Sequence, residues 1–258
     1  MIPLAAYSGR DSIGGFGMIA GGEFLLELER ALLEIGLAPS EEQLRQMDRL
    51  RQLVLYWNSR LNLTRIVSDQ EVAIKHFVDS LMPLAFALVP AGSRVADVGS
   101  GAGFPGIPLK IWDESLSVTL IESTTKKAEF LRNAAKELSI TVEVVGERAE
   151  SVGANPEYRQ SYDLVIARAV APFAVLCEYC LPLVRIGGSF VAMKGRDVDS
   201  EIAAGERAMQ LLGGHLSALH QYDLPLDMGQ RSLAVVKKVS PTPPAYPRRA
   251  GIPKKRPL

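Results

Sequence analysis

The stretch from Arg94 to Gly106, RVADVGSGAGFPG, constrains the fold more than any other part of the chain. Its first half is an apolar run interrupted by one acid, Asp97, and its second half holds glycines at positions 99, 101, 103 and 106. An apolar run that breaks into glycines predicts a buried parallel strand, a tight turn and the start of a helix. Glycines let a ligand approach the backbone closely, and a helix start offers N–H groups to a polar or anionic ligand. The stretch is therefore predicted to hold a cofactor.

Two fingerprints overlap in this stretch. Residues 101–106 match the dinucleotide pattern G-x-G-x-x-G, and residues 97–103 match the acidic-x-G-x-G-x-G pattern of class I methyltransferases. A buried carboxylate at Asp97 is costly without a partner. The amino group or sulfonium-bearing end of S-adenosylmethionine supplies one directly or through water, whereas a dinucleotide pyrophosphate would be repelled. The pattern thus favours S-adenosylmethionine, and the expected contacts are Asp97, Gly99, Ser100, Gly101 and Gly103.

Composition narrows the class of protein. The 258 residues are enough for a full α/β core. The 29 basic and 29 acidic residues give no net charge, so a surface that binds nucleic acid requires local clustering of basic residues.

The two cysteines, Cys177 and Cys180, lie in a predicted helix without nearby metal ligands, which predicts a structural pair and no metal site. The longest apolar run, 81–91, contains two prolines and is too short for a membrane span. We expect a cytoplasmic protein without a secretory signal.

The chain divides into four predicted parts. Residues 1–22 hold six glycines without periodicity and predict a flexible leader. Residues 23–90 predict a helical region, in which capping boxes at Ser40 and Ser68 open two helices. Residues 91–240 alternate between strands and helices, and residues 241–258 form a basic, proline-rich tail that we expect to lack regular structure.

Seven strands are predicted in the third part. The last two are joined by a short polar loop and should therefore pair antiparallel. Together with helices predicted at 125–138, 172–184 and 197–212, they indicate a doubly wound, seven-stranded, mostly parallel α/β sheet with a terminal antiparallel hairpin and an N-terminal helical extension. The predicted strands are 95–98, 117–121, 141–145, 162–167, 189–193, 217–224 and 231–239.

Ligands of open α/β sheets bind beyond the carboxyl ends of the strands, so the residues there are candidates. Glu122 follows the second strand and could accept hydrogen bonds from two ribose hydroxyls. Ala149 and Glu150 follow the third strand and could meet adenine, although Glu150 could equally be a surface charge. Phe104 either flanks the methionine chain of the cofactor or belongs to the core.

Basic residues follow the fourth and fifth strands. Arg168 stands where many amino-methylating enzymes carry an Asn/Asp-Pro-Pro-aromatic motif, and Lys194 and Arg196 add two charges at the same rim. Such a rim favours an anionic substrate such as nucleic acid. The tail, with Arg248 and Arg249, is either a solvated segment or a basic arm along a nucleic-acid backbone.

Six segments together resemble the RsmG (GidB) family of ribosomal RNA methyltransferases: 62–64, 75–81, 97–109, 167–169, 193–195 and 246–253. The resemblance implies a class I methyltransferase fold and transfer of a methyl group from S-adenosylmethionine to N7 of a guanine in bacterial 16S ribosomal RNA. It implies RNA as partner, either free or within the 30S subunit or an assembly intermediate. We expect neither a membrane nor DNA as partner, and we expect a monomer. Positions matching the family's cofactor contacts are Gly99, Phe104, Glu122, Ser123, Thr124, Ala149, Glu150 and Arg168, with Glu122 in place of the usual Asp.

The predicted chemistry needs no general base, because guanine N7 carries a lone pair. We therefore predict no catalytic acid or base and expect catalysis by positioning. Arg168, Lys194 and Arg196 would steer the RNA, extended by Arg248 and Arg249. Two alternatives stay open: a methyltransferase of another substrate on this fold, and a non-catalytic module that binds RNA or cofactor.

Overall fold

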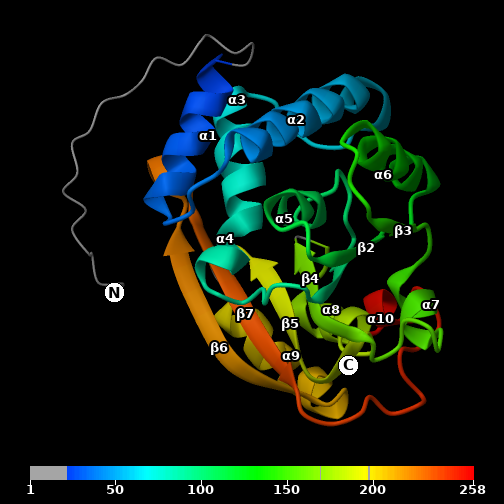
Figure 1. Ribbon diagram of the computed structural model, residues 1–258. Coiled ribbons are helices and arrows are strands. Elements are labelled where there is room, and N and C mark those ends of the chain that lie inside the picture. Colours follow the sequence, from blue (N-terminus) through cyan, green and yellow to red (C-terminus); the bar gives the residue numbers. More distant parts are fainter. Residues whose placement is uncertain (1–21, 169, 197) are drawn as a thin grey trace.

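One seven-stranded sheet lies at the centre of the protein, in the order β3-β2-β1-β4-β5-β7-β6 (Figure 1). The computed structural model describes residues 22–168, 170–196 and 198–258, so the predicted leader lies outside the described residues apart from Gly22. β7 pairs antiparallel with β5 and β6, and the remaining neighbours are parallel, which confirms the predicted sheet. The strands are β1 (Arg94–Val98), β2 (Ser117–Ile121), β3 (Glu143–Val145), β4 (Tyr162–Arg168), β5 (Val184–Lys194), β6 (Gly214–Asp223) and β7 (Gln230–Lys238).

Helices cover both faces of the sheet, and each face has its own hydrophobic core. Successive side chains of a strand point to opposite faces, so Val95 joins the core under the first helices and Ala96 joins the other core. The first core lies under α1 (Gly22–Glu34), α2 (Glu41–Leu61), α3 (Asp69–Glu71), η1 (Val72–Val78), α4 (Asp79–Ala85), α5 (Gly106–Trp112) and α6 (Thr125–Glu137). The second core lies under α7 (Ala149–Ala154), α8 (Phe173–Cys180) and α9 (Asp199–Leu211). Within the described part of the chain, no helix has the length and apolar character needed to cross a bilayer.

The predicted helical region is present, with one unexpected segment. The capping box at Ser40 is confirmed, since the Gln43 N–H donates to Ser40 Oγ at 3.2 Å and the Ser40 N–H donates to Gln43 Oε1 at 2.7 Å. The helix opened by Ser68 is not uniform, because its middle part, η1, is a π-helix. Such segments are rare and occur often at functional sites. This one carries Lys75 and His76, which lie on the wall of the site described below.

Two predictions about secondary structure are wrong. The helix expected at 172–184 ends at Cys180, and β5 begins at Val184, because a bulge in the β4–β5 ladder admits residues 185–188 into the strand. The tail, expected to lack regular structure, contains the short helix α10 (Ile252–Lys255). Its Pro253 stands in the first turn, where a helix needs no N–H donor.

Gly106 marks the closest approach between the start of α5 and the sheet. A Cβ at this position lies 2.4 Å from Leu120 Cδ2 and 2.9 Å from Asp97 Oδ2. Overpacking a core costs about 1–3 kcal/mol, and each kcal/mol lowers the melting temperature of such a chain by about 2–4 °C. We therefore expect Gly106→Ala to melt several degrees below wild type. Gly195→Ala is the matched control, since a Cβ there meets no described atom within 4 Å; equal melting temperatures for the two variants would contradict this packing.

Candidate active site

The turn after β1 lies at the switch point of the sheet, because the chain passes to β2 on one side and later to β4 on the other. We call residues 99–106 the cradle. Its Gly99, Gly101 and Gly103 all have positive φ, of 79°, 57° and 92°, which only glycine adopts without strain. Ser100 is buried and its hydroxyl donates to the Asp97 carbonyl at 2.9 Å, which fixes the turn on the strand.

Asp97 lies beneath the cradle and is only 1% exposed. Its Oδ2 accepts the Gly106 N–H at 3.0 Å, whereas its Oδ1 has no hydrogen-bond partner among the described residues. Burial raises the pKa of Asp97 to about 6, although the hydrogen bond from Gly106 and the charge of Arg168 act in the opposite direction. A buried, unpartnered carboxylate oxygen at this place fits the cationic amino group of a bound cofactor.

Glu122 joins the end of β2 to the cradle. Its Oε2 accepts the Gly101 N–H at 3.0 Å and its Oε1 accepts the Thr124 N–H at 2.7 Å. Each carboxylate oxygen can accept a second hydrogen bond, so the acid can still bind ribose hydroxyls. The structure thus places Glu122 and the backbone of Thr124 beside the cradle, and the ribose contact stays a prediction.

A hollow of about 170 Å³ opens beside the cradle, and we call it the strand-end pocket. It brings together four predicted residues from three places along the chain, namely Gly99, Ser123, Ala149 and Glu150. Glu150 is buried, and its Oε1 accepts the Gly251 N–H at 2.7 Å, so it is not a surface charge. The pocket also contains Lys254 of the tail, a residue that sequence reasoning did not select.

Phe104 packs between aromatic rings of the first core. It is 4% exposed, and its ring stacks on His76 with a centroid separation of 4.6 Å and meets Phe77 edge-on at 5.2 Å. Of the two expected roles, packing in the core is therefore observed, and contact with the methionine chain stays a prediction. Burial, followed by the charge of Arg168, lowers the pKa of His76 to about 3, so the imidazole is neutral near pH 7.

Arg168, the last residue of β4, links the sheet to the helical region. Its Nη1 donates to the Lys75 carbonyl at 3.0 Å and to Asp79 Oδ2 at 3.1 Å, and its guanidinium lies 5.5 Å from the centre of the Phe104 ring. The Tyr222 hydroxyl donates to Asp79 Oδ1 at 3.0 Å. Sequence reasoning found Arg168 but missed Asp79 and Tyr222, because nothing local in the sequence relates residues 143 positions apart.

A second hollow, of about 360 Å³, is lined by Arg168, and we call it the basic hollow. Lys194 lines the basic hollow, and its ammonium group donates to Glu201 Oε2 at 2.6 Å and to the Ala171 carbonyl at 2.8 Å. Arg196 is exposed just beyond β5. The basic hollow is lined by Ile66, Lys75, His76, Asp79, Arg168, Met193, Lys194, Gly195 and Arg231.

The basic tail is bound to the body of the protein through Arg248. Its guanidinium donates to both carboxylate oxygens of Glu178, with Nη2–Oε2 at 2.6 Å and Nε–Oε1 at 2.9 Å, and Glu178 is 1% exposed. A buried carboxylate requires such a partner, so Arg248 is held by the protein in this structure and does not project as part of an arm. Arg249 is exposed.

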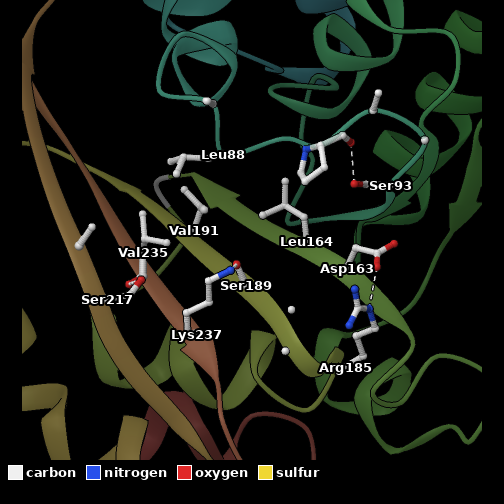
Figure 2. A pocket seen from close by; sticks show the side chains of 17 residues that line it. Leu88, Ser93, Asp163, Leu164, Arg185, Ser189, Val191, Ser217, Val235 and Lys237 are labelled. Carbon is white, nitrogen blue, oxygen red and sulfur yellow. Dashed lines mark hydrogen bonds and ion pairs between the residues drawn. The ribbon is translucent and has the colours of Figure 1, made fainter. Parts of the chain in front are cut away.

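A cavity of about 500 Å³ at the opposite end of the sheet contains none of the predicted site residues (Figure 2). Asp163 and Arg185 form an ion pair at one side of it at 2.6 Å, and Asp163 also accepts the Arg94 N–H at 2.7 Å. Its floor is apolar, with Leu164 and Val191. Because ligands of such sheets bind at the carboxyl ends of the strands, we assign the site to the cradle and its two hollows.

Removal of Asp79 should destabilise the protein by leaving Arg168 without its carboxylate. Breaking a buried ion pair costs about 3–5 kcal/mol, whereas losing one neutral donor to a carboxylate costs about 1.5–3 kcal/mol. We expect Asp79→Ala to lower the free energy of unfolding more than Tyr222→Phe does. Denaturant titrations of both single variants and the double variant measure this. Additive losses would contradict the shared network.

Comparisons with known proteins agree with this geometry. A family model described as GidB, rRNA small subunit methyltransferase G, matches residues 43–232. The ribosomal RNA small subunit methyltransferase G of Desulforamulus reducens is 42% identical over 237 residues, which cover 92% of this chain and 99% of the relative. The protein of the same name from Pelotomaculum thermopropionicum is 47% identical over 226 residues, 87% of this chain and 95% of the relative.

Among solved structures, a Corynebacterium glutamicum protein is similar with a TM-score of 0.52 at 17% sequence identity, over 83% of this chain and 97% of that chain. This likeness concerns the fold alone. The family model and the relatives, by contrast, extend over most of the chain and include the cradle, Glu122 and Arg168. The chain belongs to the GidB family of rRNA small subunit methyltransferases G.

Proposed function

We propose that this protein transfers the methyl group of S-adenosylmethionine to N7 of a guanine in 16S ribosomal RNA. The description of the family and the names of the relatives support methyl transfer to small-subunit RNA. The observation that carries the proposal in the structure is the unpartnered Oδ1 of Asp97 under a glycine cradle at the switch point of the sheet. The choice of N7 comes from the family resemblance and agrees with the side chains near Arg168.

The residues around the cradle fit S-adenosylmethionine. Asp97 would hold its ammonium group, Glu122 its ribose hydroxyls, and the strand-end pocket with Glu150 its adenine. When bound, the cofactor supplies an electrophilic methyl group on a sulfonium centre. The protein contributes a rigid binding surface, because the cradle is tied to β1 through Ser100 and to β2 through Gly99, whose N–H donates to the Ile121 carbonyl at 2.8 Å.

The basic hollow would receive the target guanosine. It carries four cationic side chains, and phosphate contacts by such groups dominate the affinity of proteins for nucleic acid. Lys194 and Arg168 are oriented by Glu201 and Asp79, whereas Arg231 has no carboxylate partner among the described residues. Arg196, at the edge of the hollow, and exposed Arg249 of the tail would extend the path of the RNA.

The chemistry at N7 agrees with the side chains of the hollow. His76 is held neutral, and its two ring nitrogens lie 2.9 Å from Thr64 Oγ1 and 3.4 Å from Arg168 Nη2. Asp79 is shared between Arg168 and Tyr222. Neither group is available as a general base, and a guanine N7 lone pair requires none. The protein would therefore act by aligning N7 with the methyl group.

We further propose that the protein acts as a cytoplasmic monomer on RNA rather than on DNA or a membrane. Free 16S RNA and the 30S particle are both candidate substrates. Transfer from labelled S-adenosylmethionine should be measured with each, and the label then mapped. Label at N7 of one guanine is expected. Label on another atom or molecule would support a methyltransferase that acts on a different substrate. Binding of S-adenosylmethionine without any methyl transfer would support a non-catalytic module. Either result would contradict the proposed function.

Cofactor binding should depend on pH through Asp97. Its carboxyl is protonated below pH about 6, where it loses its attraction for the cofactor ammonium. The dissociation constant for S-adenosylmethionine should therefore rise as pH falls through about 6, by up to tenfold per pH unit. Calorimetric titration of wild type from about pH 5 to about pH 8 measures this.

Two variants serve as controls for the pH dependence. Asp97→Asn should bind more weakly and without the titration, because an amide cannot ionise. Glu41→Gln changes an exposed acid of α2 and should keep the wild-type profile. A flat wild-type profile over this range would exclude Asp97 as the partner of the ammonium group.

A further inference from the structure

The tail is bound to the body of the protein at several points. Arg159 donates to the carbonyls of Thr242 at 2.9 Å and of Tyr246 at 2.8 Å. Arg248 forms the bidentate ion pair with Glu178 described above. These contacts satisfy backbone groups and a buried acid that would otherwise be costly. The tail up to Arg248 therefore has a defined path across the protein.

Beyond Arg248 the tail reaches the strand-end pocket. The Gly251 N–H donates to Glu150 Oε1 at 2.7 Å, and Glu150 is both 4% exposed and part of the pocket lining. Figure 1 shows α10 beside α7 and α8, the two helices that contribute Glu150 and Tyr179 to this pocket. The acid expected to meet adenine is thus itself held by the tail.

Lys254 brings a cation to the same pocket. Its side chain lines the hollow together with Glu147 and Glu150, yet it forms no ion pair with any described carboxylate. An ammonium group offers three donors and no acceptor. Adenosine presents the adenine nitrogens N1, N3 and N7 and the ribose oxygens, which accept hydrogen bonds. Lys254 therefore adds a charged donor beside Glu147 and Glu150, in a pocket to which the body of the protein contributes one other cation, Arg148.

We propose that residues 248–254 form a wall of the cofactor site, with Lys254 as a residue that contacts the adenosine part of S-adenosylmethionine. This inference rests on the proposed function, since it assigns part of the binding site for the proposed cofactor. It gives Lys254 and the anchored backbone of the tail a task different from the RNA contact proposed for Arg249. Arg248 and the Gly251 N–H are positioning groups in this assignment, because they act through Glu178 and Glu150.

Adjacent Lys255 provides a matched control for Lys254. Both lysines are exposed and lie in α10, but only Lys254 lines the strand-end pocket. Lys254→Ala should raise the dissociation constant for S-adenosylmethionine about tenfold, the effect of losing one hydrogen bond from a charged donor. Lys255→Ala should keep the dissociation constant for S-adenosylmethionine within about twofold of the wild-type value. Calorimetric titration of the full chain measures both, and unchanged melting temperatures show that folding is intact.

Arg248→Lys tests whether the contact between Arg248 and Glu178 positions the tail, since a lysine keeps the charge but cannot form the bidentate contact with Glu178. It should weaken cofactor binding while RNA binding at fixed salt stays near wild type. Equal cofactor affinities for wild type, Lys254→Ala and Lys255→Ala would overturn the inference, and equal losses of RNA affinity for the two lysine variants would assign the tail to RNA instead. A wild-type protein without affinity for S-adenosylmethionine would refute the proposed function itself.

Discussion

The buried carboxylate of Asp97 is the constraint on which the rest of the site depends. One oxygen accepts the Gly106 N–H and so fixes α5 against β1, while the other is left without a described partner. The close approach leaves no room for a Cβ at position 106, which a glycine satisfies. Desolvation makes the unpartnered oxygen costly, so a bound cation suits this position. The same carboxylate therefore ties together the packing of the sheet edge and the proposed binding of the cofactor.

Arg168 connects this cofactor site to the surface proposed for RNA. It stands at the end of β4, beside β1, and its hydrogen bonds reach the π-helix and Asp79 of α4. Tyr222 of β6 completes the contact to Asp79. Three segments that are distant in sequence, residues 72–85, β4 and β6, are thus held around one guanidinium. The helical region is in this way part of the site wall, and its orientation relative to the sheet is fixed by charge-assisted hydrogen bonds.

Much of this fold follows from local patterns in the sequence. The glycine turn, the terminal antiparallel hairpin and the position of Glu122 could be predicted because each depends on neighbouring residues and on known rules for α/β sheets. The network of Asp79 and Tyr222 could not, since it joins segments through tertiary packing. The attachment of Arg248 could not be predicted for a related reason. The charges of the tail indicate solvent or RNA, whereas Glu178, the buried partner of Arg248, lies in a helix whose burial the charge pattern does not reveal.

Gly99 of the cradle lines the strand-end pocket, and Arg168, at the end of the neighbouring strand β4, lines the basic hollow. The proposed reaction requires the cofactor to bridge these two hollows. A crystal structure of the protein with S-adenosylmethionine tests this most directly. The account predicts the ammonium group within hydrogen-bond reach of Asp97 Oδ1, directly or through one water, adenosine in the strand-end pocket and the methyl group directed toward the basic hollow. Cofactor density in the cavity at the opposite end of the sheet, or a methyl group turned away from Arg168, would contradict it.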